Sequence, residues 1–128
     1  MLLDDPAFTI RIAPERNYVE IVMRGYWDDA TMKRFDSELR RMLPALPAGG
    51  CRIGEQNTLF DTTAYAVQSQ DVLAQLGTMA SDPSIGSRRI AVLVSSVLNK
   101  LQTRRIAPGY GLFSDREAAL QWLFEPDA

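Results

Sequence analysis

Polar and aromatic side chains gather where three predicted strands end, at Trp27, Asp28, Asp61, Thr62, Thr63, Ser95 and Ser96. In open α/β sheets, ligands bind outside the carboxyl ends of the strands. We therefore predict that these residues contact a ligand or a partner. Carboxylates can act as general bases, but no partner acid, nucleophile or metal cluster accompanies Asp28 or Asp61. We predict no catalytic residue, no metal ligand and no cofactor.

The chain contains no histidine and one cysteine, Cys51. A Ser–His–Asp triad, a Cys–His pair, the common zinc sites and an internal disulfide are therefore excluded. The stretch "PAGGCRIGEQN" predicts an exposed loop in which Cys51 is an incidental residue. It is not a phosphate-binding loop, because it has no P-loop lysine and precedes a strand.

Hydrophobic periodicity predicts the elements that position these residues. Alternating apolar residues in "AFTIRIA" and "YVEIVMRG" predict an antiparallel hairpin. Helical spacing predicts a helix that Asp28 or Asp29 caps and that Pro44 ends, with an inner face of Met32, Phe35, Leu39, Met42 and Leu43. Three further strands follow, at "TLFDTT", "RRIAVLVSS" and "GYGLF", with a helix after each.

The last three helices have their own signals. Ser69 or Gln70 begins the first of them, which runs to about Ala80. Val97, Leu98 and Leu101 are predicted to face inward on the second. Ser114 and Glu117 form a capping box for the third, whose predicted inner face is Ala118, Ala119, Trp122 and Leu123.

The resulting order, β-β-α-β-α-β-α-β-α, predicts an α/β fold with a single mixed β-sheet of five strands and four helices. Right-handed crossovers make the last three strands parallel. We expect one domain over residues 1–128, since no segment is large enough for a separate core.

This order resembles the STAS superfamily, and more narrowly its SpoIIAA-like stand-alone domains. The stretches "RRIAVLVSS", "QTRRIAP" and "LFSDREAALQWL" are similar to fold-supporting segments of that family. The resemblance implies a phosphorylatable Ser or Thr in an Asp-Ser-Ser-Gly-like turn at the start of the second helix. Here that stretch is "DTTAYAVQSQDVL", which lacks the turn but contains Ser69. Ser69 is therefore the regulatory candidate, with a plain N-cap as the alternative.

A basic interval lies between Asp82 and Asp115. It contains no acid and five basic residues, so its net charge is +5 in a chain of net charge −2: Arg88, Arg89, Lys100, Arg104 and Arg105. Such asymmetry attracts an acidic partner, a phosphate or an anionic lipid headgroup. The alternative is a set of ordinary solvated side chains. Lys100, Arg104 and Arg105 are therefore added to the residues predicted to contact a ligand or a partner.

These observations predict a non-enzymatic, STAS-like regulatory module that acts by protein–protein contact. The alternative is a small-molecule or lipid-binding module with a pocket at the strand carboxyl ends. The acidic pI of about 5.1 disfavours nucleic-acid binding. The start "MLLDDPAF" does not have the pattern of a secretory signal, and no apolar run is long enough to span a membrane. We expect a cytoplasmic protein and leave homo-oligomerisation open.

Overall fold

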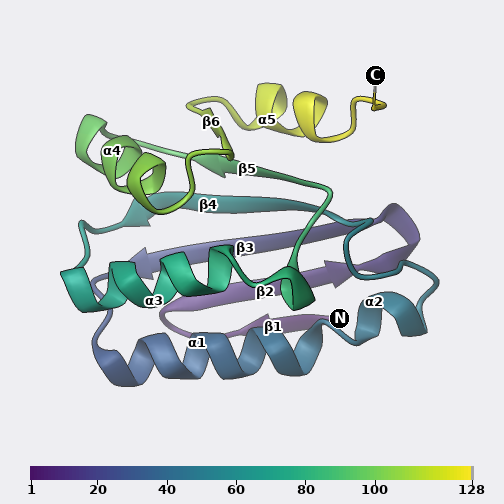
Figure 1. The fold of residues 1–128 in the computed structure, drawn as a ribbon, viewed down its shortest axis with the longest axis horizontal. Helices are drawn as coiled ribbons and strands as arrows, with labels where there is room; N and C mark the ends of the chain where they lie inside the picture. The colour runs from purple at the N-terminus through teal and green to yellow at the C-terminus, as the bar shows by residue number, and fades with distance from the viewer. Residues whose placement is uncertain (128) are drawn as a thin grey trace.

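The computed structural model describes residues 1–127 and contains one six-stranded sheet in the order β1-β2-β3-β4-β5-β6 (Figure 1). The strands are β1 (Leu2–Asp4), β2 (Phe8–Ala13), β3 (Tyr18–Gly25), β4 (Asn57–Tyr65), β5 (Arg89–Leu93) and β6 (Gly111–Phe113). The first three pair antiparallel, and β3 to β6 are parallel. The predicted mixed sheet is confirmed, with one strand more than expected.

The additional strand, β1, is too short to show an alternating pattern in the sequence. It forms because β2 offers a free edge, along which Leu3 lies opposite Ile10. The Met1 ammonium group also donates to Ile12 O at 3.0 Å. Tertiary pairing, and not local propensity, creates this strand.

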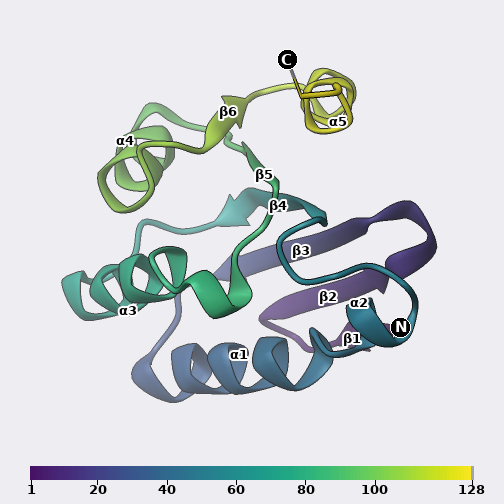
Figure 2. The ribbon, with the colours of Figure 1, turned by 45° about the vertical axis from the view of Figure 1, so that its right-hand side comes forward.

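The predicted helices are present as α1 (Asp29–Met42), α3 (Gln70–Ala80), α4 (Val97–Ile106) and α5 (Arg116–Leu123). Residues predicted to be a loop form a further short turn, α2 (Ala45–Ala48), and 3₁₀ turns occur at η1 (Pro14–Arg16) and η2 (Pro83–Ile85). Helix α3 packs against both α1 and α4, while α5 packs against β4, β5 and β6. Figure 2 shows α5 on the side of the sheet away from α1 and α3.

The larger core lies between α1 and the sheet. The alternating faces Phe8–Ile10–Ile12 and Val19–Ile21–Met23 are buried, as is the complete predicted inner face of α1. Trp27 lies in the same core, with its ring centroid 5.0 Å from Phe35 and 5.9 Å from Phe8. Burial of such aromatic rings supplies much of the hydrophobic stabilisation of a domain this size.

A second core lies under α5. Leu59, Ala91 and Leu93 from the sheet meet Ala119 and Leu123 from the helix. The strand β5 is therefore covered on both faces, as its continuous apolar run predicted. The predicted inner face of α5 was partly wrong, because Ala118 is exposed and Trp122 is only half-buried.

The predicted cap of α5 was also wrong by one residue. The Asp115 carboxylate, and not the Ser114 hydroxyl, accepts a hydrogen bond from Ala118 N, at 3.0 Å. A carboxylate at this position also interacts favourably with the helix dipole. Asp115 therefore takes the N-cap position that the capping-box pattern assigned to Ser114.

Cys51 does not lie in an exposed loop, contrary to the prediction. Its side chain is fully buried in the larger core, and its backbone N–H donates to Leu46 O at 2.8 Å. The turn α2 folds the Pro- and Gly-rich segment back onto the sheet and thereby encloses the thiol. Burial raises the pKa of the Cys51 thiol, with a smaller contribution from Glu55.

The predicted orientation of α4 is reversed. Val97, Leu98 and Leu101 are 73%, 63% and 54% exposed, whereas Asn99 is buried. The Ser96 hydroxyl accepts from Asn99 N at 3.1 Å and so sets the start of the helix. Its inner face is therefore mainly polar, and Val97, Leu98 and Leu101 face outward.

Candidate functional site

A cavity of about 110 Å³ lies between the sheet and the helices α1, α3 and α4. Its walls are mostly apolar. The sheet contributes Val19, Ile21, Met23, Phe60, Ile90 and Val92, and the helices contribute Phe35, Leu39, Leu43, Leu73, Leu76, Met79 and Ile106. An apolar cavity lined by a few polar groups is the usual form of a small-molecule site.

Polar groups lie at both ends of this cavity. Near the start of β4, Thr58 Oγ1 lies 2.7 Å from Ser87 Oγ, and Gln56 Nε2 donates to Gly86 O at 3.0 Å. Near the carboxyl ends of the strands, Thr62 Oγ1 lies 2.6 Å from Leu93 O and 2.9 Å from Asn99 Oδ1. These groups are already paired within the protein.

Tyr65 is different. It lines the cavity, and its hydroxyl is the one buried side-chain polar atom of residues 1–127 that has no hydrogen-bond partner. Burial raises the pKa of Tyr65, so the hydroxyl stays protonated and available as a donor. An unpaired buried polar group costs about 1–3 kcal/mol. A bound molecule with an acceptor atom would recover part of that free energy.

Gln68 lies beside the carboxyl ends of β3 and β4, where we predicted a pocket. Its side chain accepts from Trp27 N at 2.8 Å and donates to Gly25 O at 3.0 Å and Ala66 O at 2.7 Å. Its backbone N–H donates to Gln102 Oε1 at 3.1 Å. The buried amide thus joins two loops and α4 at the place where a ligand was expected.

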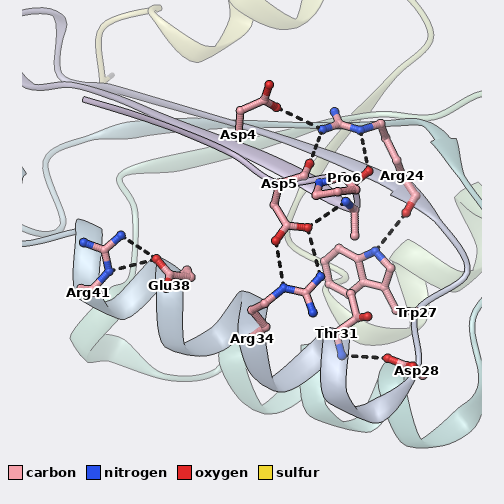
Figure 3. Close-up of polar contacts among 11 residues, drawn as sticks. Asp4, Asp5, Pro6, Arg24, Trp27, Asp28, Thr31, Arg34, Glu38 and Arg41 are labelled. Atoms are coloured by element: carbon pink, nitrogen blue, oxygen red, sulfur yellow. Dashed lines mark hydrogen bonds and ion pairs between the residues drawn. The ribbon is translucent and has the colours of Figure 1, made fainter.

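Trp27 does not contact this cavity, and it is only 1% exposed. Figure 3 shows its indole Nε1 donating to Arg24 O, at 3.0 Å, and Asp28 capping α1 through Thr31 N, at 2.8 Å. The backbone hydrogen bond from Thr31 lowers the pKa of Asp28. Trp27 therefore stabilises the core, and Asp28 caps helix α1.

The hydroxyl candidates also lie apart. Ser69 caps α3 by accepting from Val72 N at 3.2 Å, which is the predicted N-cap arrangement. Asp61 accepts from Thr63 N at 3.0 Å within β4, and Ser95 is exposed. Of the predicted strand-end residues, Thr62 alone lines the cavity.

The basic interval divides into two parts. Arg88 donates to Asn57 Oδ1 at 2.8 Å and Leu123 O at 2.9 Å, and Arg89 donates to Trp122 O at 2.7 Å. Both therefore hold the end of α5 against the sheet. Lys100, Arg104 and Arg105 lie on α4, and among residues 1–127 they have no ion-pair partner.

Sequence reasoning missed the cavity residues on α4 and beside it, namely Asn99, Gln102, Thr103, Ile106 and Tyr110. The signal for the helical ones was present. Asn99, Gln102, Thr103 and Ile106 are spaced by three or four residues and so share one helix face. The prediction instead placed Val97, Leu98 and Leu101 on the inner face, because they are apolar.

In the part of the chain that the structure describes, no three His, Cys, Asp or Glu side chains are grouped so as to hold a metal ion. Within the same residues, no helix has the length and apolar character that crossing a membrane requires.

A solved structure has a similar fold. It is an uncharacterised protein of the DUF3478 family with a SpoIIAA-like fold, from Shewanella loihica PV-4, and the two chains align with a TM-score of 0.68. The alignment covers 96% of this chain and 98% of the other at 19% sequence identity. No protein-family model matches this chain, and no curated protein matches it. The protein therefore has a SpoIIAA-like fold, as its resemblance to the STAS superfamily predicted.

Proposed function

We propose that the protein is a non-enzymatic binding module that holds a small apolar molecule in the cavity between the sheet and α3 and α4. The observation that carries this proposal is the mostly apolar cavity, whose wall includes Tyr65, the residue with the unpaired buried hydroxyl. We therefore propose the small-molecule alternative, with its site on the sheet face and not at the strand ends.

The cavity limits the chemistry of the ligand. The cavity, at about 110 Å³, is smaller than the enclosed ~150 Å³ cavity that binds benzene, but it is partly open to solvent, so it suits a small ring or short acyl chain that extends toward the opening. The ligand should carry a neutral acceptor, such as a hydroxyl or carbonyl oxygen, to pair with Tyr65. A charged group would have no counter-ion among the cavity residues, because none of them is acidic or basic.

Binding of benzene and 1-hexanol to the purified protein tests this proposal. We expect saturable shifts of backbone amide resonances in β5 and α4, and a raised thermal midpoint, because a ligand that binds only the folded state stabilises it. Val92→Phe, which places a ring in the cavity, should weaken both ligands at least about 10-fold, equivalent to ~1.4 kcal/mol. Val92→Ile serves as the conservative control.

Tyr65→Phe separates the polar contact from the apolar one. It should lower the affinity for 1-hexanol by roughly 3- to 10-fold, because a neutral hydrogen bond contributes about 0.5–1.5 kcal/mol. The affinity for benzene, which has no polar group, should be unchanged. Equal affinity of wild type and Val92→Phe for both probes would show that the cavity is not the binding site.

A second candidate is the predicted regulatory contact with an acidic protein partner, through the outer face of α4. The favouring observation is that three exposed apolar residues, Val97, Leu98 and Leu101, lie on the same helix as the three unpaired basic residues. The N-cap Ser69 lies close by, because Gln68 bonds to Gln102 on α4. A phosphate on Ser69 would place negative charge beside this surface and so oppose an acidic partner.

For this contact we expect that Lys100→Glu, Arg104→Glu and Arg105→Glu together slow association with a captured partner, most strongly at low salt, because exposed charges act mainly on encounter rates. The thermal midpoint should change little. A triple replacement of Lys33, Arg41 and Arg52 with Glu makes the same charge change elsewhere. If both triple variants associate equally fast across a salt series, α4 is not the contact surface.

A further inference from the structure

A polar groove of about 290 Å³ lies on the other face of the sheet, beside α5. It is lined by Arg11 from β2, Arg16 from η1, Tyr18 and Glu20 from β3, and Arg116 and Leu120 from α5. The N-terminal hairpin and the C-terminal helix, which are about 100 residues apart in the sequence, thus converge on one surface. The sheet separates this groove from the apolar cavity.

Three contacts define the geometry of the groove. Tyr18 Oη donates to Glu20 Oε1 at 2.6 Å, and the Arg116 guanidinium forms an ion pair with the same carboxylate. The Arg16 guanidinium lies over the Tyr18 ring, 5.5 Å from its centroid. Arg11 is the cross-strand partner of Glu20, so the two side chains are on the same face of the sheet.

The charges of the groove do not balance. Three guanidinium groups face one carboxylate, which leaves a net charge of +2. Glu20 is paired with Arg116, while Arg11 and Arg16 form no ion pair with any of residues 1–127. Tyr18 adds no negative charge, because burial and the neighbouring Glu20 raise its pKa.

We propose that this groove binds a phosphate dianion, either free or as the phosphate group of a small molecule, through Arg11, Arg16 and Arg116. The net charge of +2 matches that of a dianion, and the guanidinium fork suits bidentate hydrogen bonding to phosphate oxygens. The Glu20 carboxylate places the Arg116 guanidinium in the groove but competes with phosphate for it. Leu120 offers an apolar contact for the organic part of a phosphate ester.

Titration with inorganic phosphate and with phenyl phosphate, at constant ionic strength in a chloride buffer, tests the proposal by calorimetry and by amide shifts in β2, β3 and α5. Charge-assisted hydrogen bonds to phosphate are roughly twice as strong as hydrogen bonds between neutral groups. We therefore expect the double variant Arg11→Gln with Arg16→Gln to lower the affinity for phosphate at least about 10-fold. Arg41→Gln with Arg52→Gln removes the same charge from another surface and should leave the affinity nearly unchanged.

Glu20→Gln gives a result in the opposite direction. It removes the competing carboxylate, frees Arg116 and keeps an acceptor for Tyr18, so phosphate should bind several-fold more tightly. A phenyl phosphate affinity above that of inorganic phosphate identifies a phosphorylated small molecule as the ligand, and equal affinities identify free phosphate. If the two double variants lose affinity equally, or if Glu20→Gln binds no more tightly than wild type, the attraction is general surface charge and the site does not exist.

Discussion

Replacing Trp27 with alanine is expected to lower the free energy of unfolding by about 3–5 kcal/mol. The indole is 1% exposed and lies within 6 Å, centroid to centroid, of Phe8, Phe35 and Tyr65, at 5.9, 5.0 and 5.0 Å. Its removal leaves a large cavity and frees the Arg24 carbonyl that its Nε1 now satisfies. Urea denaturation followed by far-UV circular dichroism measures this loss.

Trp122→Ala is the matched control for Trp27→Ala. The Trp122 ring is half-buried and lies against Phe113 and the Arg89 guanidinium. We expect Trp122→Ala to lower the free energy of unfolding by about 1–3 kcal/mol, which is within the ordinary range for single substitutions. If Trp27→Ala proves less destabilising than Trp122→Ala, the aromatic cluster around Trp27 is not the centre of the core.

The Cys51 thiol is expected to react with a disulfide reagent at least about a thousandfold more slowly in the native protein than in urea. Two effects act in the same direction. The thiol is fully buried, and its raised pKa lowers the fraction of reactive thiolate. Reaction then requires an opening whose free energy is on the scale of the ~5 kcal/mol or more that unfolds a domain.

The absorbance of the thiolate that the reagent releases measures these rates. The reaction of glutathione in the same buffers corrects for the effect of urea on the rate of thiol–disulfide exchange. A native rate within tenfold of the unfolded rate would mean that the segment after α2 does not pack on the core as described. The result also bears on regulation, because a thiol this slow cannot act as a redox sensor.

The two proposed sites can be tested independently because they lie on opposite faces of the sheet. The cavity is formed where α1, α3 and α4 cover one face, and the groove where α5 meets the other beside β2 and β3. Val92 and Tyr65 take no part in the groove, and Arg11 and Arg16 take no part in the cavity. Failure of one binding experiment therefore leaves the other intact.

Local pattern was sufficient for much of the fold. Alternation identified β2 and β3, and helical spacing identified the whole inner face of α1, because burying one face produces these periods directly in the sequence. The caps Asp28 and Ser69 were also predictable, since a short acceptor side chain acts on backbone N–H groups only two or three residues away. The order of strands and helices then led to parallel pairing.

The candidate site required the tertiary structure. The inner face of α4 is polar because it meets Thr62 and Gln68, which belong to β4 and the loop after it. No local period reveals those partners. Gln68 itself, Cys51 and β1 were missed or misplaced for the same reason, since each is determined by a contact with residues distant in the sequence or by the packing of a short segment.

The sequence by itself determined the alternation of β2 and β3, the inner face of α1, the caps of α1 and α3 and the order of the predicted elements, all of which depend on residues close together in the chain. The tertiary structure alone decided which way α4 faces, where the cavity lies and which arginines converge beside α5. Those features depend on side chains brought together from separate elements, and their free energies arise only when the sheet and both helix layers are assembled.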